Sequence, residues 1–173
     1  MSKRLLLQPD LVLGGVITDL TPEILQANQI EGLILDVDET LVPIRETIVT
    51  PDLARWAEEM KQVVSLWLVS NNLSHNRIGS IARALDLPYF LAAKKPSRKK
   101  LQQAAYEMNL PVTKVAMVGD RLFTDVVAGN RLGMFTILVE PMVHPAIAKR
   151  PYPIRDFEVW ISQKLGVSLA TNK

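Results

Sequence analysis

Cysteine is absent from the 173-residue sequence, which excludes a disulfide framework, a thiolate nucleophile and a cysteine-bound zinc site. Its absence also suits a reducing cytoplasm, where we expect the protein to work. Excess charge is lacking too: 20 Lys and Arg against 18 Asp and Glu leave only +2, too little to indicate a nucleic-acid partner. With 48% hydrophobic and 22% charged residues, the composition is that of an ordinary folded chain.

Long hydrophobic runs are also missing near the N-terminus. The run from Leu11 to Ile17 is far shorter than the about 20 residues of a spanning helix, and the segment makes no convincing signal peptide. We interpret residues 1–30 as an extension that packs on the domain or contacts a membrane peripherally, because Lys3 and Arg4 lie beside leucines. The length fits one domain over residues 1–173, with a proline-rich connection and a last helix in residues 140–173.

Short apolar runs rich in Val, Ile and Leu indicate five strands. They show little polar alternation, which is typical of parallel strands covered on both faces. The runs span residues 32–36, 63–70, 89–92, 115–119 and 134–139. Helical segments alternate with them, so the sequence predicts an α/β fold with three layers: a Rossmann-like, mainly parallel sheet with helices on both faces.

The intervening segments carry helix-start signals and helical spacing of apolar residues. Thr50 followed by Pro51 predicts one start, and Ser74 and Ser97 are candidate caps for two more helices. A short fourth helix is expected from Asp125 to a stop at Gly133. The last helix has an apolar stripe typical of a face that packs on a core, formed by Phe157, Trp160, Ile161 and Leu165.

Polar side chains follow four of the predicted strands at the point where each strand ends. In chain order they are Asp36 and Asp38, then Ser70, Asn71 and Asn72, then Lys94 and Lys95, and finally Asp120 and Asp125. Each group alone is ordinary turn chemistry, and the basic run at residues 94–100 alone is typical of a solvated surface. Since the carboxyl ends of parallel strands meet at one edge of a sheet, the four groups together predict a single site.

The electrostatic repulsion among several carboxylates at one edge of the sheet must be offset by positive charge. Two carboxylates about 5 Å apart repel by roughly 3 kcal/mol at an effective dielectric near 20. A divalent cation and one ammonium offset that repulsion, and a few carboxylates with retained water are the ligands that Mg²⁺ prefers. Open coordination positions suit a phosphate oxygen, while Lys95, the Ser70 hydroxyl and backbone amides near Asn71 hold its other oxygens. The sequence therefore predicts a magnesium site that handles phosphate.

These groups resemble the four motifs of the haloacid dehalogenase (HAD) superfamily of aspartate-dependent phosphohydrolases. The first is D-x-D-x-T at residues 36–40, and the others correspond to Ser70, to Lys95 in "KKP" and to the acidic pair Asp120 and Asp125. The resemblance implies a strand order of 3-2-1-4-5 and an aspartyl-phosphate intermediate on Asp36. It further implies that Asp38 serves as acid and base, and that Mg²⁺ is held by the Asp36 side chain, the Asp38 carbonyl and Asp120, with Asp125 in support.

A narrower resemblance, to subclass IIIA and its bacterial, plant and mitochondrial phosphatidylglycerophosphate phosphatases, covers most of the chain. It rests on "LDVDETLVP", "VSNN", "KKP" and, above all, the stretch from Val118 to Pro141. It implies that phosphatidylglycerophosphate is converted to phosphatidylglycerol in phospholipid synthesis. Glu39 departs from the Asn that is common in relatives, and the adjacent Lys94 and Lys95 leave open which lysine serves the site.

Substrate size follows from a separate observation. Neither residues 40–63 nor residues 70–95 have room for the cap domain that encloses small substrates in this superfamily. An open site suits a lipid headgroup at the inner face of a membrane, where Lys3, Arg4 and the 94–100 run would contact anionic lipid. Two alternatives remain: a capless phosphatase acting on a soluble nucleotide, sugar or protein phosphate, and a receiver-like domain that keeps phosphate on Asp36. Oligomeric state is left open, and His75 and His144 add little.

Overall fold

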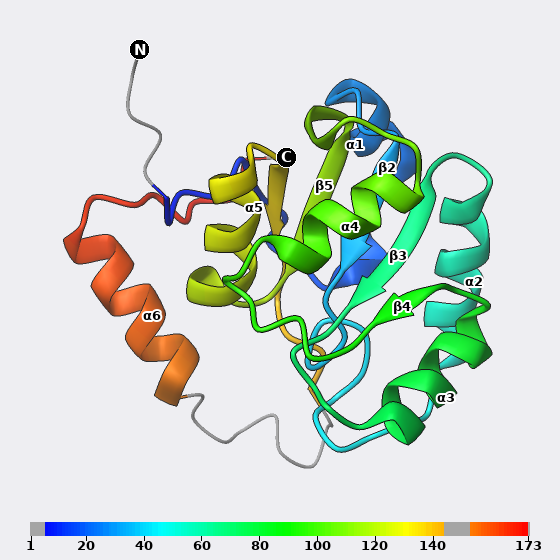
Figure 1. Cartoon of the computed structure of the whole chain (residues 1–173). Coiled ribbons are helices and arrows are strands. Elements are labelled where there is room, and N and C mark those ends of the chain that lie inside the picture. The colour runs from blue at the N-terminus through cyan, green and yellow to red at the C-terminus, as the bar shows by residue number, and fades with distance from the viewer. Residues whose placement is uncertain (1–5, 144–152, 173) are drawn as a thin grey trace.

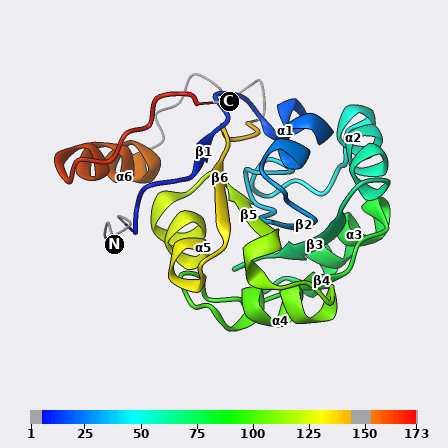
Figure 2. The ribbon, with the colours of Figure 1, turned by 90° about the horizontal axis from the view of Figure 1, so that it is seen from above.

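The computed structural model describes residues 6–143 and 153–172 of the chain. Its centre is a parallel sheet of six strands in the order β1-β6-β5-β2-β3-β4 (Figures 1 and 2). The strands are β1 (Leu11–Val12), β2 (Gly32–Leu35), β3 (Ser65–Val69), β4 (Tyr89–Phe90), β5 (Val115–Gly119) and β6 (Phe135–Leu138). The five predicted strands are β2 to β6, and their order along the sheet is the predicted 3-2-1-4-5.

The expectation of five strands is wrong by one, because β1 extends the sheet at its edge. Leu11 pairs with Ile137 and Val12 with Leu138. A strand of two residues has no periodicity of its own, and its partner lies far away in the sequence. Asn172 forms hydrogen bonds with the edge of β1 that faces away from β6. The Val12 amide donates to Asn172 Oδ1 over 2.6 Å, and the Asn172 amide donates to the Val12 carbonyl over 3.3 Å.

Helices cover both faces of the sheet, as predicted (Figure 2). They are α1 (Pro22–Ala27), α2 (Pro51–Lys61), α3 (His75–Leu85), α4 (Lys99–Glu107), α5 (Val127–Leu132) and α6 (Pro153–Lys164). Apolar residues of α1, α2 and α3 pack with Leu33 and Leu35 on one face. Residues of α4 and α5 pack with Ile34 on the other. Every side chain of β2 is therefore buried, which explains its continuous hydrophobic run.

The expected helix starts are partly confirmed. Thr50 caps α2 by accepting a hydrogen bond from the Leu53 amide, and Ser74 caps α3 by accepting one from the Arg77 amide. The prediction for Ser97 is wrong: α4 begins two residues later, after Arg98, without a side-chain cap. A turn of π-helix, Leu122–Val126, precedes α5 and contains Asp125.

Helix α6 does not use the apolar stripe that its sequence predicts. Phe157, Trp160 and Leu165 are exposed, whereas Glu158 is buried. Glu158 accepts hydrogen bonds from Arg121 Nη2 over 2.6 Å and from the Leu122 amide over 3.1 Å. A charge-assisted anchor thus ties α6 to the residues that follow β5, and this anchor decides which face of the helix turns inward.

The strand order reverses between the neighbouring strands β2 and β5: β3 and β4 are added on the side of β2, and β6 on the side of β5. Ligands of open α/β sheets bind beyond the carboxyl ends of the strands at such a point. Over the described residues no domain is inserted after β2 or between β3 and β4, in agreement with the expected absence of a cap. Among the helices described, none is both long and apolar enough to cross a bilayer. The positions of Lys3, Arg4 and His144 fall outside the described residues.

Candidate active site

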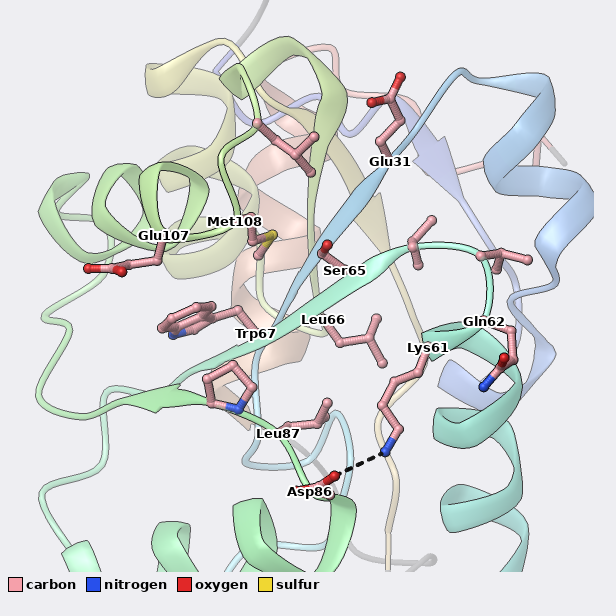
Figure 3. Close-up of a pocket in the computed structure, with 14 residues that line it drawn as sticks. Glu31, Lys61, Gln62, Ser65, Leu66, Trp67, Asp86, Leu87, Glu107 and Met108 are labelled. Carbon is pink, nitrogen blue, oxygen red and sulfur yellow. Dashed lines mark ion pairs between the residues drawn. The ribbon is translucent and has the colours of Figure 1, made fainter.

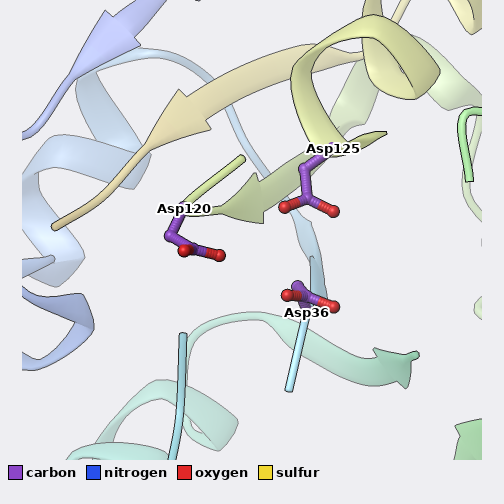
Figure 4. A group of neighbouring side chains, drawn as sticks. All are labelled: Asp36, Asp120 and Asp125. Atoms are coloured by element: carbon purple, nitrogen blue, oxygen red, sulfur yellow. The ribbon is translucent and has the colours of Figure 1, made fainter. Parts of the chain in front are cut away.

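Three carboxylates converge at the carboxyl edge of the sheet, where the strand order reverses between β2 and β5 (Figure 4). Asp36 follows β2, Asp120 follows β5, and Asp125 lies on the π-helical turn. All three are buried, and one oxygen of each lies within 4.8 Å of the others. Thr40 contributes a hydroxyl 3.4 Å from both Asp36 Oδ2 and Asp120 Oδ1. The sequence predicted this convergence, apart from the bridging hydroxyl.

Lys95 supplies the compensating positive charge. Its ammonium lies 2.6 Å from Asp36 Oδ1 and 2.7 Å from Asp125 Oδ1, and its side chain is only 1% exposed. Neighbouring Lys94 is exposed, so the lysine placed in the site is Lys95. Asn71 fixes the backbone of Lys95 from two sides: its Oδ1 accepts from the Lys95 amide over 2.7 Å, and its Nδ2 donates to the Lys95 carbonyl over 3.2 Å.

Ser70 lies at the end of β3 and is fully buried. Its hydroxyl oxygen accepts a hydrogen bond from the Asn72 amide over 3.0 Å, and its own amide donates to the Phe90 carbonyl of β4. The oxygen is thereby fixed at the same edge as the three carboxylates, where its proton can be offered to a ligand. The placement agrees with the phosphate-binding role expected of Ser70, which stays a prediction.

Asp38 lies apart from the cluster of three carboxylates. It is partly exposed, and its Oδ1 is 2.5 Å from Arg77 Nη1, while its Oδ2 accepts from Asn72 Nδ2 over 3.4 Å. The sequence interpretation placed Asp38 in the site but missed Arg77. The only sequence signal for this residue is its position three residues after the Ser74 cap, in the first turn of a helix that starts at the same edge.

Burial dominates the electrostatics of the acids. It raises the pKa of Asp36 to about 7, helped by the charge of Asp125 and opposed by Lys95. It raises the pKa of Asp120 to about 8, with further contributions from Asp36 and Asp125. Burial alone would lower the pKa of Lys95, but the charges of Asp125 and Asp36 outweigh it and raise that pKa above its usual value. The site therefore holds Lys95 charged and favours protonation of Asp36 and Asp120.

These shifts predict how stability depends on pH when metal is removed. The folded-state pKa values of Asp36 and Asp120 exceed those of the unfolded chain, so the folded protein binds more protons between about pH 4 and 8. Its free energy of unfolding should therefore fall as pH rises through that window, by at least about 2 kcal/mol. Urea unfolding in EDTA would measure the slope, and added Mg²⁺ should remove most of it. A flat metal-free profile would contradict the prediction.

The same residues fit a divalent cation. Three ionised carboxylates and one ammonium leave two negative charges, which one divalent ion balances. Asp120 Oδ2 is buried and has no hydrogen-bond partner among the described residues, which is costly unless something else binds it. Oxygen ligands in a carboxylate cluster are typical of hard cations. The cluster can therefore bind a divalent metal.

Gly119, the last residue of β5, makes room for Asp125. A Cβ at this position would lie 2.1 Å from Asp125 Oδ2 and 2.3 Å from its Cγ. The Asp125 side chain therefore packs directly on the strand end, where its Oδ2 also accepts from the Arg121 amide over 3.2 Å. The glycine of the "GD" pair at the end of the fourth predicted strand therefore has a structural role, because any larger residue would occupy the space that the Asp125 carboxylate fills.

Gly119→Ala should displace Asp125 and with it one partner of Lys95. We expect catalysis at this site to fall by about 10²-fold, because small displacements of catalytic groups have effects of that size. Overpacking should cost about 1–3 kcal/mol of stability. An activity assay would measure the first consequence and urea unfolding the second, and circular dichroism would establish that the variant is folded. Wild-type activity in the variant would show that Asp125 tolerates the displacement.

A wider hollow of about 750 Å³ lies at the opposite, amino edge of the sheet (Figure 3). Its lining includes an ion pair between Lys61 Nζ and Asp86 Oδ2, which are 4.0 Å apart. Ser65 and Trp67 of β3 also line it. The described residues that line this hollow form no cluster of acids that could hold a metal, and the strands begin there rather than end. The chemistry thus belongs to the carboxyl edge, where the three carboxylates and Lys95 converge.

A parallel α/β sheet with a buried acid cluster and a buried lysine at its switch point can bind a divalent metal and a phosphate group. Residues 92–152 match the model of the HAD-hydrolase-like family. The chain is 37% identical over 143 residues to a probable phosphatase, YqeG, of Bacillus subtilis, covering 82% of this chain and 81% of that protein. The chain therefore belongs to the HAD superfamily and is a phosphatase of that superfamily.

More distant relatives are similar over less of their length. A phosphatidylglycerophosphate phosphatase of Arabidopsis thaliana is 30% identical over 142 residues, 77% of this chain and 40% of that protein. One of Chlamydomonas reinhardtii is 30% identical over 127 residues, 68% of this chain and 47% of that one. This chain thus spans less than half the length of either.

Solved structures agree with the fold. A cobalt-bound sugar-phosphate phosphatase of Haemophilus influenzae, named for deoxy-D-mannose-octulosonate 8-phosphate, aligns with a TM-score of 0.52 at 13% identity, over 80% of this chain and 91% of that one. A hypothetical protein of Xanthomonas campestris aligns with a TM-score of 0.55 at 20% identity, over 79% and 78%. At these identities the likeness concerns the fold, which is the predicted Rossmann-like one. Together with the family assignment, it removes the receiver-like alternative.

Proposed function

We propose that this phosphatase uses Mg²⁺ and an aspartyl-phosphate on Asp36 to convert phosphatidylglycerophosphate to phosphatidylglycerol. The observation that carries the mechanism is the contact of 2.6 Å between the Lys95 ammonium and Asp36 Oδ1 inside the buried acid cluster. A carboxylate is a poor nucleophile toward an anionic phosphate unless cations neutralise the incoming charge. The lipid assignment is supported by the two relatives that carry that substrate in their names.

The chemistry proceeds in two displacements at phosphorus. In the first, a carboxylate oxygen of Asp36 forms a bond to phosphorus while the bond to the leaving oxygen breaks, and Asp38 gives its proton to that oxygen. In the second, Asp38 takes a proton from water as the water oxygen attacks phosphorus, which releases inorganic phosphate and restores the Asp36 carboxylate. Lys95 and Ser70 hold phosphoryl oxygens during both displacements.

The metal would be held by the side chains of Asp36 and Asp120 and the carbonyl of Asp38, with Asp125 in support. When bound, Mg²⁺ supplies positive charge to the phosphoryl oxygens and thereby favours attack by an anionic carboxylate. Asp120 Oδ2, buried without a partner among the described residues, is the atom that gains most from such an ion.

The surroundings of the site support a substrate at a bilayer. Large apolar side chains are exposed on the loops that leave the carboxyl edge: Ile44 and Ile48 after β2 and, 78% exposed, Leu73 after β3. Exposed basic residues accompany them, Arg45 beside Ile44 and Lys94 beside the site lysine. Apolar side chains that enter the headgroup region, together with cations that attract anionic lipid, are typical of a surface that rests on a membrane.

The lipid assignment is tested by measuring phosphate release from phosphatidylglycerophosphate in mixed micelles with Mg²⁺. Phosphate release from p-nitrophenyl phosphate provides the comparison with a soluble ester. We expect Asp36-dependent phosphate release to be at least about 10-fold more efficient on the lipid. Asp36-dependent cleavage of the soluble ester alone would keep the mechanism and overturn the lipid assignment, leaving the capless phosphatase of soluble esters.

In the lipid case, Ile48→Ser combined with Leu73→Ser should lower activity on vesicles about 30-fold. The physical reason is that each apolar side chain that no longer enters the bilayer removes about 1 kcal/mol of binding free energy. Tyr106→Ser, which alters an equally exposed residue of α4, is the matched control and should keep wild-type activity on vesicles.

A further inference from the structure

Arg77 connects three segments around Asp38. It lies in the first turn of α3, where its amide donates to Ser74 Oγ over 3.2 Å. Its side chain leaves the helix and places Nη1 2.5 Å from Asp38 Oδ1 and Nη2 3.2 Å from the Pro43 carbonyl. The side chain is only 11% exposed, so the guanidinium is packed into the edge of the site. One planar group thus bonds the acid and the loop that follows it.

The other contacts of Asp38 fix its backbone, so the orientation of its carboxylate depends mainly on Arg77. Its backbone is fixed by a bridge to Val42, beside which the Glu39 amide donates to the Val42 carbonyl over 2.8 Å. Among the described residues, its second carboxylate oxygen receives one long contact, of 3.4 Å, from Asn72 Nδ2. A charge-assisted bond from a guanidinium is the stronger of the two side-chain contacts. Without it, the Asp38 side chain would be free to choose among rotamers.

We infer that Arg77 is the positioning residue for Asp38: it holds the carboxyl group on the leaving-group side of the site and ties it to the loop at Pro43. The inference rests on the proposed function, in which Asp38 protonates the leaving oxygen. Proton transfer requires heavy atoms within about 3 Å of each other, so an Asp38 that rotates freely is a poor acid even when it is chemically intact. Arg77 touches no reacting atom in this account and acts through Asp38 alone.

A role through Asp38 predicts a dependence on the leaving group that a merely structural role would not produce. Alkyl phosphates leave as strongly basic alkoxides and need a proton from Asp38. The p-nitrophenolate anion leaves without one. Loss of Arg77 should therefore lower kcat/KM by about 10²-fold for glycerol 3-phosphate, the size of a typical acid–base contribution, and by less than about 5-fold for p-nitrophenyl phosphate.

The experiment measures kcat/KM of Arg77→Gln across a series of soluble alkyl and aryl phosphates. Arg83→Gln is the matched control, since Arg83 is exposed on the same helix. We expect a steeper dependence on leaving-group pKa for Arg77→Gln, the same as for Asp38→Asn, and no further loss in the double variant. Arg77→Lys should recover part of the loss, because it keeps a cation but cannot bond Asp38 and Pro43 together.

An equal loss on all esters, or additive losses in the double variant, would overturn the inference, as would wild-type behaviour of Arg77→Gln. Because the alkyl and aryl phosphates are soluble, this result does not depend on the lipid assignment. The micelle experiment tests that assignment separately. Activity retained in Asp36→Asn would instead overturn the proposed mechanism and, with it, the role of Arg77.

Discussion

Replacing Asp36 with Asn should reduce phosphate release by at least about 10³-fold while leaving the protein folded. The amide is isosteric but cannot attack phosphorus, and it removes one of three carboxylates available to a metal. Folding should not suffer without metal at pH 8, since burial and Asp125 raise the pKa of Asp36 to about 7 and make its charged form unfavourable.

Malachite-green assays of phosphate release and thermal unfolding in EDTA would measure the two effects separately. Asp52→Asn is the matched control, because Asp52 is an exposed residue in the first turn of α2 whose contact within the described part of the chain is with the equally exposed Arg55. That control should keep wild-type activity. If Asp36→Asn retained more than about one tenth of the activity, the nucleophile would have to be another residue.

Replacing Lys95 with Met should damage both activity and folding. The thioether chain fills a similar volume, but three buried acids would lose the cation that lies 2.6 Å from Asp36 and 2.7 Å from Asp125. Removing one partner of a buried ion pair typically costs about 3–5 kcal/mol, since the remaining charges stay buried. We expect metal-free Lys95→Met to be destabilised by that amount at pH 8, and its activity to fall by at least about 10²-fold.

Lys94→Met provides a strict control for this prediction, because it makes the same chemical change one residue away at an exposed position. Urea unfolding with and without Mg²⁺ would distinguish the electrostatic cause from a packing defect. The ion should restore part of the lost stability in Lys95→Met, whereas a packing defect would persist. Equal stability of the two variants would contradict the neutralising role of Lys95.

The strand ends were predictable from the sequence because two local signals coincide there. A continuous apolar run marks a strand covered on both faces, as β2 is, and the first charged residue after the run marks its end. Once Asp36 and Asp120 are placed at strand ends, parallel topology brings them to one edge. Their closeness in space therefore follows from general rules of sheet geometry.

Other features depend on long-range packing that no local pattern records. Arg77 meets Asp38 across 39 residues only because of the loop geometry between β3 and α3. On α6 the apolar stripe predicted the wrong inward face, because Glu158 binds Arg121 and outweighs the hydrophobic pattern. Hydrophobic periodicity cannot reveal a polar anchor of this kind. The missed strand β1 has the same explanation, since two residues contain no period to detect.

The edge of β1 that does not pair with β6 affects the tendency of the protein to self-associate. An uncovered edge strand offers its amides and carbonyls to any neighbouring strand and so invites aggregation. Here the segment 168–172 occupies that position, with Asn172 bonded to Val12 and Ser168 bonded to Gln8. Deleting residues 168–172 should therefore promote concentration-dependent self-association, measurable by light scattering. This segment would then contribute to colloidal stability.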